Sequence, residues 1–253
     1  FAASLLSKGA AVGLPVVLFL LLWWKRLPID RAARIRLAPY AGLTALFCAI
    51  ELLFMSQLTS HPVFELQPGE RVLLMIRNLA FYVEKSLLPM HLSFIYPRWE
   101  LGWPSLVASW VLVPWTSLAA WGLVRRPGWW RGLVAAQVVF VAMIAPVLGL
   151  FDVFFFKFSY VADHYVYLAL PAALVVVVAG LERLPRAPSL LLLGLLCVAF
   201  ALQAWTQAKN YRNAEVLWTQ ALESNPNAWM AHNHLAVLHQ LDRRLEEARH
   251  HYE

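Results

Sequence analysis

The chain has 253 residues, of which 60% are hydrophobic and only 14% are charged, and its mean hydropathy is +0.58. Soluble domains carry about 25% charged residues, so this composition excludes an ordinary soluble domain and indicates that most of the chain lies in lipid. The formal net charge is +6. Because the basic residues cluster in short loops between apolar runs, as in cytoplasmic loops of membrane proteins, we do not expect nucleic-acid binding.

Apolar runs of about 20 residues predict membrane spans, since a helix rises 1.5 Å per residue across a hydrocarbon core of about 30 Å. Six runs reach this length, some of them only with flanking residues: 9–24, 37–58, 104–124, 132–151, 166–181 and 190–205. We therefore expect residues 1–205 to form a bundle of six transmembrane helices.

The orientation of these spans follows from three basic loops. Clusters of Arg and Lys lie at 25–36, 125–131 and 183–186, and the positive-inside rule places all three in the cytoplasm. The stretch 71–88 then does not cross, and its polar pairs at heptad spacing predict a helix lying in the membrane interface. The alternative is a spanning helix whose charges face a protein interior. Because 71–88 is not counted as a membrane crossing, everything after Trp205 is expected on the non-cytoplasmic side.

The segment 206–253 is polar and carries a repeat of 34 residues. Ala214 recurs as Ala248, Trp218 recurs as Tyr252, and Pro226 closes the first unit. This is the pattern of tetratricopeptide (TPR) repeats, in which small residues let paired helices pack closely. We expect about one and a half repeats, with the first helix continuing directly from the last span. A generic protein-binding platform would have the same pattern.

The sequence is expected to be a piece of a longer protein. Its first residues are already apolar, and its last residues stop within a repeat. More repeats are expected beyond Glu253, because one and a half units cannot bury their own faces.

Two predicted external segments, 94–100 and 158–165, combine charged and aromatic residues. Asp163 and His164 lie at the mouth of a span, where ionisable groups are costly and usually functional. Asp163 could instead cap a helix. Tyr96 and Tyr165 are supporting candidates in the same segments. We interpret Trp99, together with Trp103 and Tyr160, as an interfacial anchor.

Lys8 and Arg98 could each hold a lipid phosphate, and each could equally be a cation that reaches toward the membrane surface. The histidines of 232–251 have spacings that suit a helix surface better than a metal site, so no zinc is expected there. No cofactor is expected, and the sequence leaves a role for a divalent metal open.

Together these motifs resemble a known family. Leu5-Leu6-Ser7-Lys8, the stretch 94–99, the stretch Ala162–Leu168 and the TPR units look like the transmembrane and TPR-containing O-mannosyltransferases, and the chain is closer to their bacterial relatives. The resemblance implies an all-α protein: a polytopic bundle similar to the GT-C class of glycosyltransferases in residues 1–205, followed by a TPR α-solenoid in 206–253.

The resemblance also implies a function and a location. Such proteins transfer a sugar, here expected to be mannose, from a polyprenyl-phosphate donor to Ser or Thr of proteins. The TPR units would hold the acceptor polypeptide, on the periplasmic side of a bacterial inner membrane. The family's catalytic carboxylate would precede Phe1, so the 253 residues are expected to be inactive alone. Lys8, Arg98, Asp163 and His164 would then face the donor's phosphate or sugar.

Two other functions fit the same sequence. Some O-antigen ligases and related transferases of lipid-linked glycans also end in TPR units. A non-enzymatic membrane scaffold could use TPR units for envelope assembly, and it would not depend on any of the four candidate residues.

Overall fold

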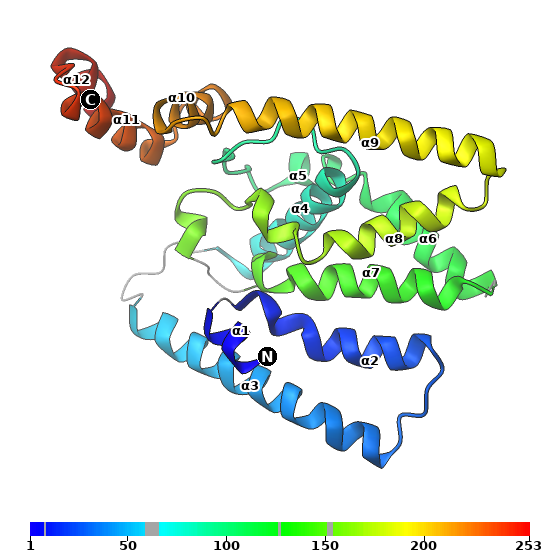
Figure 1. Cartoon of the computed structure of the whole chain (residues 1–253). Coiled ribbons are helices and arrows are strands. Elements are labelled where there is room, and N and C mark those ends of the chain that lie inside the picture. Colours follow the sequence, from blue (N-terminus) through cyan, green and yellow to red (C-terminus); the bar gives the residue numbers. More distant parts are fainter. Residues whose placement is uncertain (8, 59–65, 126–127, 151–153) are drawn as a thin grey trace.

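A computed structural model describes residues 1–7, 9–58, 66–125, 128–150 and 154–253, and every element within these ranges is helical (Figure 1). The α-helices are α1 (Ala2–Ser7), α2 (Leu14–Trp24), α3 (Arg31–Leu58), α4 (Pro68–Leu87), α5 (Trp103–Val107), α6 (Leu112–Arg125), α7 (Trp130–Ile144), α8 (Leu170–Leu181), α9 (Arg186–Lys209), α10 (Ala214–Ser224), α11 (Trp229–Leu241) and α12 (Leu245–Tyr252). Four short 3-10 helices accompany them: η1 (Gly9–Gly13), η2 (Ala145–Val147), η3 (Phe154–Lys157) and η4 (Asp163–Val166). The all-α fold class is confirmed.

Three helical stretches are long and apolar enough to cross a membrane: Arg31–Phe54 in α3, Trp130–Val147 in α7 and η2, and Arg186–Lys209 in α9. They overlap three of the six predicted spans. The helices α2 and α8 are apolar but shorter. The 12 residues of α8 measure about 18 Å, less than a hydrocarbon core of about 30 Å.

The predicted span 104–124 is not a single helix. It consists of α5 and α6, separated by turns at 108–111. Pro114 gives a reason for the break, because a proline has no N–H to donate and its ring clashes with the carbonyl four residues earlier. In the first turn of α6 the same proline is tolerated, since first-turn N–H groups have no partner within the helix.

The outer helices expose apolar side chains on all sides. No residue of the windows Arg31–Phe54 and Arg186–Lys209 is buried inside the structure, although both windows are strongly apolar. A helix that is apolar all round and unburied within its own chain suits contact with lipid. These helices are therefore compatible with a membrane location.

The main core lies among α4, α7 and α8. Its buried side chains include Phe81 and Tyr82 of α4, Phe140 and Ile144 of α7, and Ala173 of α8. In Figure 1, the axes of α2, α7, α8 and α9 are roughly parallel, with α7 and α9 running opposite to α2 and α8, and α4 crosses these axes obliquely.

The helix expected at 71–88 is present as α4, which is not among the candidate spans of the described residues. It is embedded in the body, however, with seven buried residues: Leu74, Asn78, Ala80, Phe81, Tyr82, Val83 and Ser86. Its place relative to a membrane surface stays a prediction.

The last span continues without interruption toward the C-terminal helices, as expected. The helix α9 is unbroken from Arg186 to Lys209, and α10–α12 extend beyond the end of the body where α9 finishes (Figure 1). A single rigid helix therefore connects the apolar body to α10–α12, which we call the C-terminal helices.

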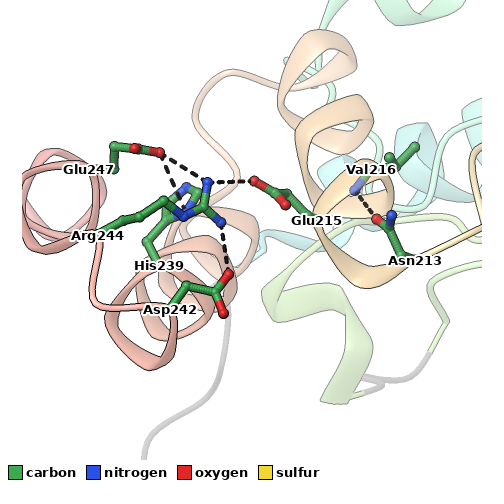
Figure 2. Close-up of polar contacts among 7 residues, drawn as sticks. All are labelled: Asn213, Glu215, Val216, His239, Asp242, Arg244 and Glu247. Carbon is green, nitrogen blue, oxygen red and sulfur yellow. Dashed lines mark hydrogen bonds and ion pairs between the residues drawn. The ribbon is translucent and has the colours of Figure 1, made fainter.

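Polar contacts tie the C-terminal helices to one another (Figure 2). The side chain of Asn213 accepts a hydrogen bond from the N–H of residue 216 at 2.8 Å and caps α10. Arg244, at the start of α12, donates to Glu215 of α10 at 2.9 Å. The same guanidinium donates to Asp242 at 3.0 Å and to Glu247 at 3.2 Å. One arginine thus links the first and last of the three helices.

Some landmark positions of the predicted repeat are buried, whereas Ala214, Pro226 and Tyr252 are exposed. Trp218 is 8% exposed, Leu235 is 2% exposed and Ala236 is 0% exposed, and Ala248 is 4% exposed. Small buried residues at these positions allow close helix packing. Packed helices of this kind are compatible with a helical repeat, and the assignment to TPR stays a prediction.

Candidate site at the junction of the body and the C-terminal helices

The structure brings two of the predicted site residues into direct contact. The hydroxyl of Tyr96 donates a hydrogen bond to Oδ1 of Asp163 at 2.8 Å. The same hydroxyl accepts a hydrogen bond from the backbone N–H of Ser93 at 3.0 Å. Tyr96 is 7% exposed and Asp163 is half-buried. The two external segments predicted to carry chemistry therefore meet at this pair.

The environment changes the acidity of both groups. Burial raises the pKa of Asp163 to about 6, while the hydrogen bond from Tyr96 and the nearby charge of Lys85 oppose that rise. Burial also raises the pKa of Tyr96, and the neighbouring carboxyl of Asp163 raises it further. Tyr96 therefore keeps its proton and acts as a donor, whereas Asp163 changes its charge close to neutral pH.

Local backbone structure explains how Asp163 is held. Ala162 is extended, and its N–H donates to the buried hydroxyl of Tyr82 at 3.3 Å. Asp163 is the first residue of η4, and the cap position belongs to Ala162. The interpretation of Asp163 as a helix cap is therefore wrong, because the hydrogen bond of its side chain joins it to Tyr96.

The other candidates within the described residues have contacts of their own. His164 is exposed, and its ring packs against Tyr165 with 4.3 Å between ring centroids. Tyr165 also contacts the ring of Phe155 edge-on at 6.0 Å. Arg98 lies close enough to Tyr160 to oppose the rise that burial causes in the pKa of that tyrosine. Lys8 lies outside the described residues.

Residues of α4 that the sequence did not single out individually form a second part of the site. Asn78 is 0% exposed, and its amide donates to the carbonyls of Leu148 at 3.0 Å and Tyr160 at 3.2 Å. Its oxygen accepts a hydrogen bond from the indole N–H of Trp99 at 3.0 Å. The guanidinium of Arg77 stacks on Trp99, with 4.5 Å from its carbon to the ring centroid.

These contacts give Trp99 a role that the sequence did not suggest. Both its ring face and its N–H have protein partners. These contacts favour a role in holding Arg77 and Asn78 over the interpretation as a membrane-interface anchor. The signal for this cluster was present in the heptad-spaced polar pairs of 71–88, because one such pair is Arg77 and Asn78.

Apolar contacts dock the C-terminal helices on the same loops. Ile95, which is 1% exposed, lies in one cluster with Trp218 and Leu235 of the C-terminal helices. Phe94 packs edge-on against Trp218 at 5.2 Å, and Phe158 packs against Trp229 at 5.2 Å. The loop that carries Tyr96 is therefore part of the interface with α10 and α11.

The part of the chain that the structure describes contains no group of three or more His, Cys, Asp or Glu side chains that could hold a metal ion. The pair of Asp163 and Tyr96 offers a hydrogen-bonded carboxyl whose pKa of about 6 lies close to neutral pH.

Comparisons with known protein families, with curated proteins and with solved structures find no match for this chain.

Proposed function

We propose that the protein is an integral-membrane glycosyltransferase that moves a sugar from a polyprenyl-phosphate donor to Ser or Thr of proteins on the non-cytoplasmic side. The observation that carries the proposal is the pair of Asp163 and Tyr96, placed where the apolar body meets the C-terminal helices. The resemblance of the sequence motifs to O-mannosyltransferases supplies the substrate class, with mannose as the sugar.

The chemistry of the transfer requires three kinds of group. The acceptor hydroxyl attacks the anomeric carbon, the bond from that carbon to the phosphate oxygen breaks, and polyprenyl phosphate leaves. The proton of the hydroxyl passes to a carboxylate base, which the resemblance places before Phe1. The leaving phosphate is stabilised by cations.

Within this scheme Asp163 suits a hydroxyl better than a phosphate. An ionised carboxylate accepts hydrogen bonds from hydroxyl groups and repels a phosphate of the same charge. At neutral pH a carboxyl with a pKa of about 6 is mostly ionised. We therefore assign Asp163 to the sugar or to the acceptor hydroxyl, with Tyr96 fixing its orientation.

The docked C-terminal helices provide the other half of the proposal. They lie against the loops that carry Tyr96 and Phe158. A polypeptide bound to these helices would lie close to Asp163, so they would present the acceptor to the site.

The test is transfer by the full-length protein in membranes, with labelled mannosyl polyprenyl phosphate as the donor and Ser/Thr peptides as acceptors. Asp163→Asn should reduce kcat/KM about 10- to 150-fold, the range expected for a lost hydrogen bond to a charged group. Glu182→Gln is the matched control, because Glu182 is an exposed carboxylate beyond the far end of α8 and should transfer at the wild-type rate.

The outcomes separate the candidate functions. No transfer from any lipid-linked sugar would favour the non-enzymatic scaffold. Transfer to a glycan and not to peptides would favour an activity like that of O-antigen ligases. Equal transfer by wild type and Asp163→Asn would remove Asp163 from the site.

A further inference from the structure

A cleft of about 430 Å³ opens beside the Asp163–Tyr96 pair. One wall is a face of α4 that includes Arg77, Glu84 and Lys85. The loop after α4, including Tyr96 and Trp99, and the end of α10 also line the cleft. Part of the polar edge that the sequence shows on this helix, namely Arg77, Glu84 and Lys85, therefore lines a cleft.

Arg77 is the feature that indicates a ligand. Its Nη1 atom is buried and has no hydrogen-bond partner within the described structure. No ion pair to Arg77 is found among the residues that the structure places. A buried donor without a partner is destabilising, and native structures retain few of them. Trp99, itself fixed by Asn78, holds the guanidinium in place by stacking.

Among the charges around the cleft, the carboxylate of Glu84 acts on Arg77 only at longer range and does not form an ion pair with it within the described residues. Lys85 donates to the carbonyl of Met90 at 2.6 Å, and its ammonium lies 3.6 Å from Glu84. Glu223 of α10 is exposed, at the rim. The lining thus carries two cations, Arg77 and Lys85, and two carboxylates, Glu84 and Glu223, so the feature that favours an anion is the buried Nη1 of Arg77 without a hydrogen-bond partner.

We propose that this cleft binds a phosphate group that carries a sugar, with the guanidinium of Arg77 on the phosphate oxygens. The planar guanidinium matches two phosphate oxygens at once. The cleft is larger than a phosphate alone, so it has room for an attached sugar. Tyr96 lines the same cleft and donates a hydrogen bond to Asp163. The sugar end of the bound ligand would therefore face that carboxyl. This assignment rests on the proposed function and names Arg77 as its phosphate-binding residue.

Binding can be measured without any transfer. Purified full-length protein in nanodiscs would be titrated with polyprenyl phosphate and, separately, with inorganic pyrophosphate. We expect both to bind in competition, and Arg77→Gln to weaken both by tenfold or more. Arg77→Lys, which keeps the charge but not the fork, should lose less. Arg212→Gln, at an exposed position after α9, is the matched control and should bind as wild type does.

Different results would overturn different statements. Unchanged binding in a folded Arg77→Gln variant would overturn the cleft assignment even if transfer occurs, so the function would stand without it. Binding of pyrophosphate without competition from the lipid would overturn the assignment to a lipid headgroup. Binding that depends on Arg77, in a protein that transfers no sugar, would support the cleft and refute the glycosyltransferase.

Discussion

Replacing Ile95 by alanine should loosen the C-terminal helices from the body. The substitution removes three carbon atoms from a side chain that is 1% exposed. At about 0.8 kcal/mol per buried methylene the loss of transfer free energy is about 2.4 kcal/mol. The cavity left behind brings the total to about 3 kcal/mol, within the range of about 2–5 kcal/mol for such truncations. The opening equilibrium of the docked helices should then shift roughly 150-fold.

Hydrogen exchange measures this opening directly. Backbone amides of α10 and α11 should exchange about 100-fold faster in Ile95→Ala than in wild type, since local opening limits their exchange. Amides of α7, in the core of the body, should exchange at the wild-type rate. Met90→Ala is the matched control, because Met90 lies in the same loop with a side chain that is 54% exposed.

One result would refute this reasoning. If α10 and α11 keep their full protection in Ile95→Ala, then Ile95 does not hold them, and the docking depends on the ring contacts of Phe94 and Phe158 alone. Faster exchange throughout α7 as well would mean that the body and the C-terminal helices open as one unit, contrary to a local interface.

Two further predictions concern Asp163 and Asn78. With a pKa of about 6 for Asp163, transfer should fall as pH drops through about 6. Tyr96→Phe removes the hydrogen bond that lowers the pKa of Asp163, so the fall in transfer should occur at higher pH. A pH–rate profile would check both expectations. The folded state also binds the extra proton between pH about 4 and 6, so stability should decrease as pH rises through that window, as thermal melts would show. Asn78→Ala leaves two carbonyls and the indole N–H of Trp99 without their partner and should lower stability by at least about 3 kcal/mol in denaturant titrations.

Local patterns predicted the helices well where one physical signal dominated. The continuity of α9 follows from an apolar run that passes into a polar helical pattern without Gly or Pro after Gly194. The apolar run 104–124 wrongly predicted one continuous helix. Hydropathy gives Pro114 little weight, although a proline removes a backbone hydrogen-bond donor and breaks a helix interior. Of the six candidate site residues, Asp163 and Tyr96, both predicted from their chemistry in external segments, are in contact in the structure.

Long-range partnerships could not be predicted in this way. Tyr96 and Asp163 are 67 residues apart, and no periodicity connects them. The prediction of a helix in the membrane interface named no partner for the polar edge of α4, because helical period alone cannot identify one. Only the folded chain places Trp99 over Arg77 and makes part of that edge the wall of a cleft.

Ile95 and Tyr96 are consecutive residues with different partners. The first is packed in the core of the C-terminal helices, and the second is bonded to Asp163. We therefore expect docking of those helices and proton binding at Asp163 to be coupled equilibria, because the residues involved share one peptide unit. Such coupling is reciprocal: a ligand that tightens the docking must change the proton affinity of Asp163, and protonation must change the affinity for that ligand by the same factor.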